Sequence, residues 1–197
     1  MEKINLKQGK HLLVIVDVIN GFIYEGALSD SSIATIITPI VALTTQYLGA
    51  DQNVVAFKDC HDEQAVEFLT YPPHCIRGTT ETELVSQLKE FEEQLLVIEK
   101  NSTNGFMTDA FQELIMNHLY DTIVVTGCCT DICVLQFALS LKGYLNQNNH
   151  KTTVIIPANM VETFHAPNHD QNYYNEISLQ LLENAGIQRY NHLEIEG

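Results

Sequence analysis

Residues 121–134, with the sequence DTIVVTGCCTDICV, decide the fold of this chain. The run from 122 to 126 is rich in β-branched residues, a pattern typical of a strand buried on both faces of a sheet. Gly127 ends this run, and Thr130 and Asp131 can cap a helix. The apolar positions then follow helical spacing, at Val134, Phe137, Ala138 and Leu141. The stretch therefore predicts a strand, a tight turn and a helix in direct succession.

Cys133 falls in the first turn of that predicted helix. Unpaired N–H groups and the positive end of the helix dipole stabilise a thiolate there. An exposed cysteine at this point of an α/β sheet is a candidate nucleophile. Free cysteine is also among the residues most often buried as small hydrophobes, so the stretch alone leaves both roles open.

The composition limits the class of protein and its partners. A chain of 197 residues is long enough for one α/β domain, and we expect a single domain over residues 1–197. Its formal charge of −15 makes nucleic acid and anionic membrane poor partners. The five cysteines, an odd number with two adjacent, are typical of reduced thiols in a cytoplasmic protein. The N-terminus is polar and no apolar run reaches membrane-spanning length. We also expect a homo-oligomer, with a subunit number that the sequence leaves open.

Strand and helix patterns alternate along the rest of the chain. Further strands are predicted at residues 11–17, 53–59, 94–100 and 152–156, with a weaker one at 187–190. Helices are predicted at residues 33–48, 81–91, 109–119, 131–145 and 169–185. This alternation predicts an α/β fold, a mostly parallel six-stranded sheet with helices on both faces.

Charged side chains end three of the predicted strands: Asp17, Asp59 and Lys100. Each has an ordinary explanation by itself, such as a turn cap for Asp17 or a surface lysine for Lys100. Ligands of open α/β sheets, however, bind at the carboxyl ends of the strands. With the Cys133 turn, the pattern predicts an acid, a lysine and a thiol at one edge, where the lysine would lower the thiol pKa.

The loop after Asp59 carries candidate metal ligands. Two carboxylates and two imidazoles form a mixed oxygen and nitrogen set that suits one divalent metal ion, with zinc preferred and manganese or iron possible. Cys60 and Cys75 flank the histidines and are competing ligands. The four preferred ligands are Asp59, His61, Glu67 and His74.

Taken together, these motifs resemble the isochorismatase-like cysteine hydrolases and, within them, the nicotinamidase (pyrazinamidase-type) family. The segment VTGCCTDICV matches the family's nucleophile motif and makes Cys133 the nucleophile. The aspartate and lysine stretches are matched by VDVINGF, with Asp17, and by EKNSTNGF, with Lys100. The metal loop is matched by DCH followed by EFLTYPPH.

This resemblance implies a hydrolase that acts on a linear amide C–N bond of a small molecule. The expected reaction converts nicotinamide to nicotinate and ammonia in NAD salvage, through a thioester on Cys133. The backbone N–H groups of Cys129 and Cys133 would hold the oxyanion. Phe22 and Tyr71 would stack on a ring that the metal orients. A non-proline cis peptide would join Cys128 and Cys129.

Five residues depart from the family pattern and are expected to touch the pocket rather than the triad: Ile19, Gly21, Thr103, Asn104 and Gly105. Another amide or ureido hydrolase of the same superfamily is therefore the nearest alternative. A catalytically silent binding or scaffold protein is a second, which the intact Asp17, Lys100 and Cys133 set disfavours. A thiol redox protein using Cys128 and Cys129 is a third, disfavoured because adjacent cysteines pair only across a distorted peptide.

Overall fold

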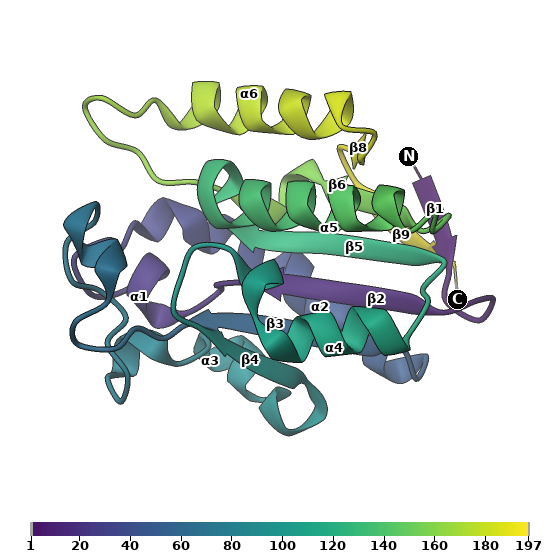
Figure 1. Cartoon of the computed structure of the whole chain (residues 1–197), viewed down its shortest axis with the longest axis horizontal. Helices are drawn as coiled ribbons and strands as arrows, with labels where there is room; N and C mark the ends of the chain where they lie inside the picture. Colours follow the sequence, from purple (N-terminus) through teal and green to yellow (C-terminus); the bar gives the residue numbers. More distant parts are fainter. Residues whose placement is uncertain (1, 197) are drawn as a thin grey trace.

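A parallel β-sheet runs through the middle of the molecule between two layers of helices (Figure 1). The protein is described by a computed structural model over residues 2–196. Within this part of the chain the sheet holds β2 (His11–Val16), β3 (Asn53–Asp59), β4 (Leu96–Lys100), β5 (Thr122–Cys128), β6 (Thr153–Pro157), β7 (Val161–Glu162) and β8 (Gln188–Tyr190). The strand order is β4-β3-β2-β5-β6-β8, β7 pairs with the end of β5, and these pairs are parallel. The predicted α/β fold with a mostly parallel sheet is confirmed.

The sheet separates the hydrophobic core into two layers, and helices cover each of them. On one face of the sheet lie α2 (Ile37–Gly49) and α3 (Ser86–Lys89), and on the other lie α4 (Asp109–Asn117), α5 (Leu135–Gln147) and α6 (Gln171–Asn184) (Figure 1). Successive side chains of β2 point to opposite faces, so Leu13 and Ile15 pack under α2 while Leu12 and Val14 pack under α5. This two-sided burial explains why the central strands are continuous apolar runs.

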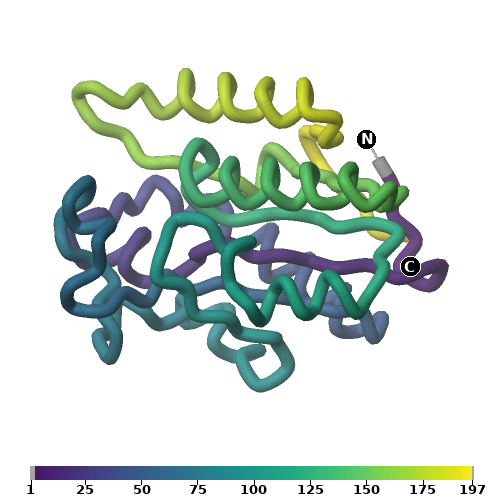
Figure 2. Tube along the Cα trace, in the orientation of Figure 1, coloured from purple at the N-terminus to yellow at the C-terminus, as the bar shows by residue number. Residues whose placement is uncertain are grey.

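The two ends of the chain form a small sheet that the sequence pattern did not predict. Strand β1 (Glu2–Asn5) pairs in parallel with β9 (Leu193–Glu196), so the termini lie close together (Figure 2). Both strands are short, half of their residues are charged, and the Lys3 side chain lies 3.9 Å from the Glu194 carboxylate. The pair therefore depends on long-range contacts, which local composition does not reveal. Strand β7 was missed for the same reason.

The predicted helix over residues 81–91 is wrong for most of its length. Only Ser86–Lys89 is α-helical, between short 3-10 turns at Thr80–Thr82 and Glu92–Gln94. The backbone at 83–85 is extended, because the Val85 N–H donates to Val18 O and the Asn20 N–H donates to Glu83 O. Pairing with this distant segment overrides the local helical pattern.

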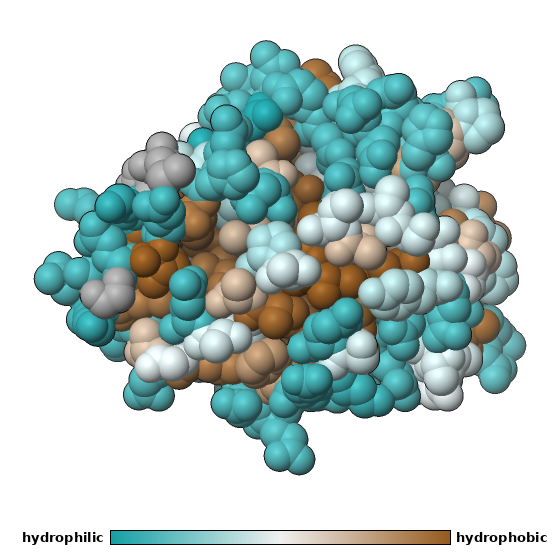
Figure 3. Space-filling view, turned by 180° about the vertical axis from the view of Figure 1, so that it is seen from behind, coloured by the Kyte–Doolittle hydropathy of each residue, from teal (hydrophilic) through white to brown (hydrophobic). Residues whose placement is uncertain are grey.

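One helical stretch within residues 2–196, Ser31–Gly49, is long and apolar enough to cross a membrane by length and composition alone. This corrects the expectation that no apolar run has that length. Residues Ile33, Ile40 and Tyr47 of this stretch are fully buried in the core beneath the sheet, which accounts for its apolar composition. From behind, on the side where α2 lies, hydrophilic side chains frame a band of hydrophobic ones (Figure 3).

Gly127 is required by the close approach of β5 to β2. Its φ of +113° is in the left-handed region, and a Cβ atom added there would lie 2.0 Å from Val16 O. The atom it would strike belongs to backbone in a neighbouring strand, which cannot move aside cheaply. We therefore expect Gly127→Ala to lower the free energy of unfolding by roughly 4 kcal/mol or more.

Urea unfolding followed by circular dichroism would measure this change. Gly143→Ala is the matched control, because Gly143 lies inside α5 and the added Cβ would meet no atom within 4 Å apart from its chain neighbours and the backbone of its own helix. That substitution should raise the free energy of unfolding by about 1 kcal/mol through helix propensity. Equal unfolding midpoints for the two variants would contradict the packing argument.

Candidate active site

Three charged side chains converge at the carboxyl edge of the sheet. Asp59 and Lys100 are the last residues of β3 and β4 and lie opposite each other in the parallel register. Asp17 directly follows β2, the neighbour of β3 on its other side, with a left-handed φ of +52°. The arrowheads of β2 and β5 point to this edge, at the left of Figure 1. The predicted convergence of strand ends is therefore present in the fold.

Lys100 links the other charged groups of this edge. Its Nζ lies 2.8 Å from Asp17 Oδ2, 2.7 Å from Asp59 Oδ1 and 4.0 Å from Cys133 Sγ. All four side chains are buried, the most exposed being Cys133 at 4%. An ammonium group in this position can stabilise negative charge on either the carboxylates or the sulfur.

Burial and the charge of Lys100 shift the pKa values of Asp17, Asp59 and Cys133. It raises the pKa of Asp17 to about 7, against the opposing effect of Lys100. Burial also acts on Asp59, but the Lys100 ammonium and the neighbouring His61 and His74 side chains outweigh it and hold the Asp59 pKa well below its usual range. Burial raises the pKa of the Cys133 thiol well above its ordinary value, and Lys100 only partly offsets this. The net shift favours the thiol form of Cys133, and Asp17 is the neighbour able to take its proton.

The turn that carries Cys133 differs from the predicted capped helix. Residues Thr130–Val134 form a π-helical turn, in which the Val134 N–H donates to Cys129 O, and α5 follows it directly. Neither Thr130 nor Asp131 caps this turn, because Cys129 holds the cap position without a side-chain bond. The peptide between Cys128 and Cys129 is cis.

Four side chains beside Lys100 form a cluster that could hold a metal ion. Their ligand atoms all lie within 4.8 Å of one another, and the residues are Asp59, His61, Glu67 and His74. The His61 Nε2 atom lies 3.3 Å from Asp59 Oδ2 and 3.8 Å from Glu67 Oε1. Asp59 belongs to both groups, since its other oxygen pairs with Lys100. Cys60 and Cys75, the competing ligands, are not part of this cluster.

The donor atoms of the cluster fit a divalent cation. Asp59 Oδ2, His61 Nε2 and Glu67 Oε1 are buried without a hydrogen-bond partner. The far ring nitrogens are held instead: His61 Nδ1 lies 3.1 Å from Asn101 Oδ1 and His74 Nδ1 lies 2.8 Å from Pro72 O. An Nδ1–H that donates to a carbonyl leaves the Nε2 lone pair directed at the cluster, as in metal-binding histidines.

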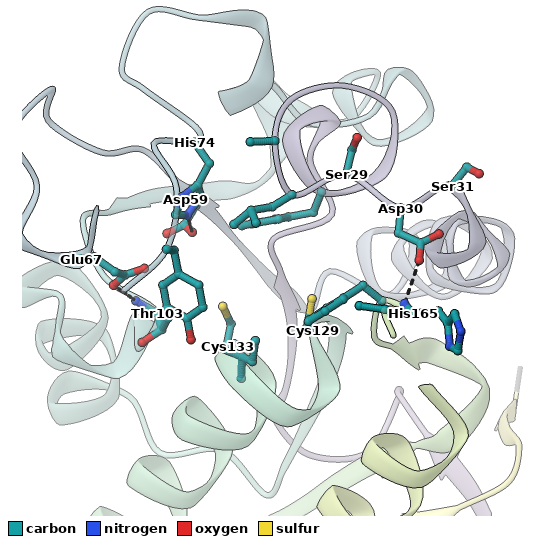
Figure 4. Close-up of a pocket in the computed structure, with 17 residues that line it drawn as sticks. Ser29, Asp30, Ser31, Asp59, Glu67, His74, Thr103, Cys129, Cys133 and His165 are labelled. Atoms are coloured by element: carbon teal, nitrogen blue, oxygen red, sulfur yellow. Dashed lines mark hydrogen bonds and ion pairs between the residues drawn. The ribbon is translucent and has the colours of Figure 1, made fainter. Parts of the chain in front are cut away.

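The thiol and the cluster open into one cavity of about 580 Å³ (Figure 4). In Figure 4, Asp59, Glu67 and His74 lie on one side of Cys133, and Ser29, Asp30 and Ser31 lie on the other. The rings of Phe22 and Tyr71 line the cavity with centroids 5.8 Å and 6.2 Å from that of His74. The two predicted stacking residues thus flank the cluster.

The five residues that depart from the family pattern mostly lie outside this cavity, which corrects the expectation that they touch the pocket. Among residues 2–196, only Thr103 of the five lines it, and its N–H donates to Glu67 Oε2. Gly21 and Gly105 permit close packing, because an added Cβ would meet Cys75 Sγ at 2.5 Å and the Phe57 ring at 2.9 Å. The other two make contacts with the backbone. Ile19 forms an isolated β-bridge with Leu84, and Asn104 Oδ1 accepts a hydrogen bond from the Phe106 N–H.

Part of the site was not predicted from sequence. The wall opposite the cluster comes from residues 27–31 and from Phe164, His165 and Ala166. Asn101, which orients His61, directly follows Lys100, and this position after a strand end was the available signal. The wall carried no comparable signal, since its two halves are more than 130 residues apart.

Comparisons with known proteins agree with this geometry. The family described as the isochorismatase domain matches residues 11–178. Nicotinamidase 1 of Arabidopsis thaliana is 33% identical over 177 residues, covering 80% of this chain and 71% of that protein. The nicotinamidase PncA structure from Bacillus subtilis has a TM-score of 0.77 and 27% identity, covering 92% of this chain and 99% of that one. The pyrazinamidase/nicotinamidase structure from Streptococcus mutans shares the fold, with a TM-score of 0.80, 21% identity and coverage of 92% and 100%.

Proposed function

The chain belongs to the isochorismatase domain family and is an amidohydrolase of the nicotinamidase/pyrazinamidase type, and we propose that its substrate is nicotinamide. The products would be nicotinate and ammonia, a step of NAD salvage. The observation that carries this proposal is the single cavity in which Cys133 lies beside both Lys100 and the cluster of Asp59 and His74.

An ammonia-release assay would test the substrate. Nicotinamide should be hydrolysed with higher kcat/KM than a ureido compound or a carbamoyl amine of similar size. A preference for the ureido compound would move the protein to another branch of the superfamily.

In the first half of the proposed reaction, the Asp17 carboxylate accepts the Cys133 thiol proton while the sulfur attacks the amide carbonyl carbon. A C–S bond forms and the carbonyl π electrons move to oxygen. The backbone N–H groups of Cys129 and Cys133 would hold this oxyanion, each donor contributing roughly 3–4 kcal/mol. The C–N bond then breaks, Asp17 returns its proton to the nitrogen, and ammonia leaves.

In the second half, water attacks the thioester that remains on Cys133. Asp17 accepts a proton from this water as the new C–O bond forms. The C–S bond breaks, and the sulfur regains a proton from Asp17. Nicotinic acid is released and ionises, and the thiol and carboxylate are restored.

Asp59, His61, Glu67 and His74 would hold one divalent metal ion, for which the donor set favours zinc over manganese or iron. When bound, the metal would supply a Lewis-acid contact for the pyridine nitrogen. The side chains of Phe22 and Tyr71 would pack against the ring, orienting the amide toward Cys133. The metal is not needed to generate a nucleophile, because the chain supplies one.

Lys100→Ala should lower kcat/KM for nicotinamide by roughly a hundredfold. The negative charge carried by Asp17 and by the attacking sulfur of Cys133 loses its neighbouring ammonium group. The substitution should also lower the free energy of unfolding by about 3–5 kcal/mol, since two buried carboxylates lose their partner. Ammonia release would measure the loss of activity, and urea unfolding the loss of stability. The iodoacetamide labelling rate of Cys133 would report the loss of the cation beside the sulfur. Lys58→Ala is the control, because Lys58 lies on the same strand pair with its Nζ near the half-exposed Glu92. Equal activity in both variants would remove Lys100 from the mechanism.

We also propose a cytoplasmic location and a homo-oligomeric assembly. All five cysteines are free, which supports a reducing compartment such as the cytoplasm. Size-exclusion chromatography with light scattering would test the expected homo-oligomer.

A further inference from the structure

A histidine outside the proposed catalytic machinery is bonded to the turn that carries the nucleophile. Asp131 lies in this turn, between Cys129 and Cys133, and does not line the cavity. Both of its carboxylate oxygens are occupied. Thr163 Oγ1 donates to Oδ1 at 2.5 Å, and His169 Nε2 lies 2.8 Å from Oδ2. The carboxylate is thus directed away from the reaction and toward a distant segment of the chain.

The His169 ring is held on all sides. Its Nδ1 lies 2.9 Å from Phe164 O, so both ring nitrogens face oxygen atoms of the protein. The ring is stacked between Phe164 and Tyr174, with centroids 3.9 Å and 3.8 Å away and interplanar angles of 9° and 11°. Only 13% of this side chain is exposed.

The segment that His169 fixes is also a wall of the cavity. We call residues 163–169 the wall loop. Phe164 and His165 of this loop line the cavity, and the His165 N–H donates at 2.8 Å to Asp30 Oδ2, in the other half of the same wall (Figure 4). The loop closes on itself through a bond from the His169 N–H to Ala166 O. The ring of His169 therefore bonds at once to the nucleophile turn and to the cavity wall.

We propose that His169 is a positioning residue for the hydrolysis. Through Asp131 it holds the π-helical turn. Cys133 Sγ and the N–H groups of Cys129 and Cys133 then point toward the same carbonyl group of the substrate. Through its stack on Phe164 it holds the wall against which the substrate lies. This inference rests on the proposed function, because the geometry matters only if the turn performs acyl transfer.

The expected size of the effect follows from the position of Asp131. The oxyanion donors and the nucleophile come from one short turn, and Asp131 is two residues from each of Cys129 and Cys133. A displacement of about 1 Å in such a turn can cost about a hundredfold in rate. Removal of His169 also leaves the Asp131 carboxylate short of one partner.

His169→Ala is the first test, with kcat and KM for nicotinamide measured at a temperature where the variant is fully folded. We expect kcat to fall ten- to a hundredfold, with a smaller change in KM. Iodoacetamide labelling of Cys133 should stay within about threefold of the parent rate, because Lys100 and Asp17 are unchanged. His169→Gln keeps a donor for Asp131 and should recover part of the lost kcat.

Tyr174→Leu is the matched control, because it removes the outer ring of the stack but leaves both bonds of Asp131. It should lower Tm while kcat stays within about twofold of the parent. The proposal is overturned if His169→Ala, like this control, loses only Tm and keeps its kcat. If His169→Ala does not fold, Asp131→Asn takes its place, and an unchanged kcat in that variant also overturns the proposal.

Failure of the proposed function would be seen separately, with the parent chain. That chain would then release ammonia from another amide in preference to nicotinamide. The ratio of kcat between His169→Ala and the parent is then measured with that amide, and the same outcomes decide the role of His169.

Discussion

Cys133→Ala should abolish ammonia release from nicotinamide, lowering kcat by roughly 10⁴-fold or more, a loss typical of removing an enzyme's nucleophile. The side chain is small, nearly fully buried and lines the cavity, so the fold should survive its replacement by alanine. The Cys133 Sγ atom lies 4.0 Å from Lys100 Nζ, which distinguishes it from Cys129, the other cysteine that lines the cavity. The iodoacetamide label that the parent chain takes up at Cys133 should also be absent from this variant.

Cys60→Ala is the matched control for this result. Cys60 is equally buried, and it follows Asp59 directly, but it does not line the cavity. Its thiol interacts with Glu99, on the side of β4 away from Lys100. The control should keep activity within about twofold and lose only a modest amount of stability. Near-normal ammonia release from Cys133→Ala would show that the thioester mechanism is wrong.

The placement of Asp17, Asp59 and Lys100 could be predicted because it follows from the parallel sheet itself. Each residue ends a strand with an apolar pattern, and the carboxyl ends of parallel strands share one edge. The part of His61 and His74 in the cluster could be predicted from residue types, since two imidazoles and two carboxylates in one loop form a recognisable donor set. Their closeness in space depends on the bond from His61 N to Cys75 O, which closes the loop.

Features that depend on contacts between distant segments could not be predicted. The extended backbone near Val85 pairs with the segment after Asp17, so the local helical pattern of residues 81–91 was misleading. Asp131 has the residue type and position of a helix cap, but His169, 38 residues away, takes its carboxylate. The net direction of the Cys133 pKa shift was also missed, because burial outweighs the lowering effect of Lys100, and burial is not written in the local sequence.

His74→Ala should remove the metal ion from the chain and lower kcat/KM for nicotinamide by roughly 10²- to 10³-fold, since loss of a direct ligand exceeds the 10–100-fold cost typical of its outer partners. Metal analysis of the purified variant and ammonia release would measure the two losses. His118→Ala is the control, because His118 is exposed and lies outside this cavity. It should keep both metal and activity.

Two further measurements separate loss of substrate binding from loss of the nucleophile. Iodoacetamide should label Cys133 in His74→Ala at nearly the parent rate, because Lys100 bonds Asp59 through the oxygen that does not face the histidines. Benzamide, which lacks the ring nitrogen, should be a poor substrate for the parent and should lose little more activity in the variant. If His74→Ala retains bound metal and full turnover of nicotinamide, the cluster is not the metal site and the proposed role of the ring nitrogen fails with it.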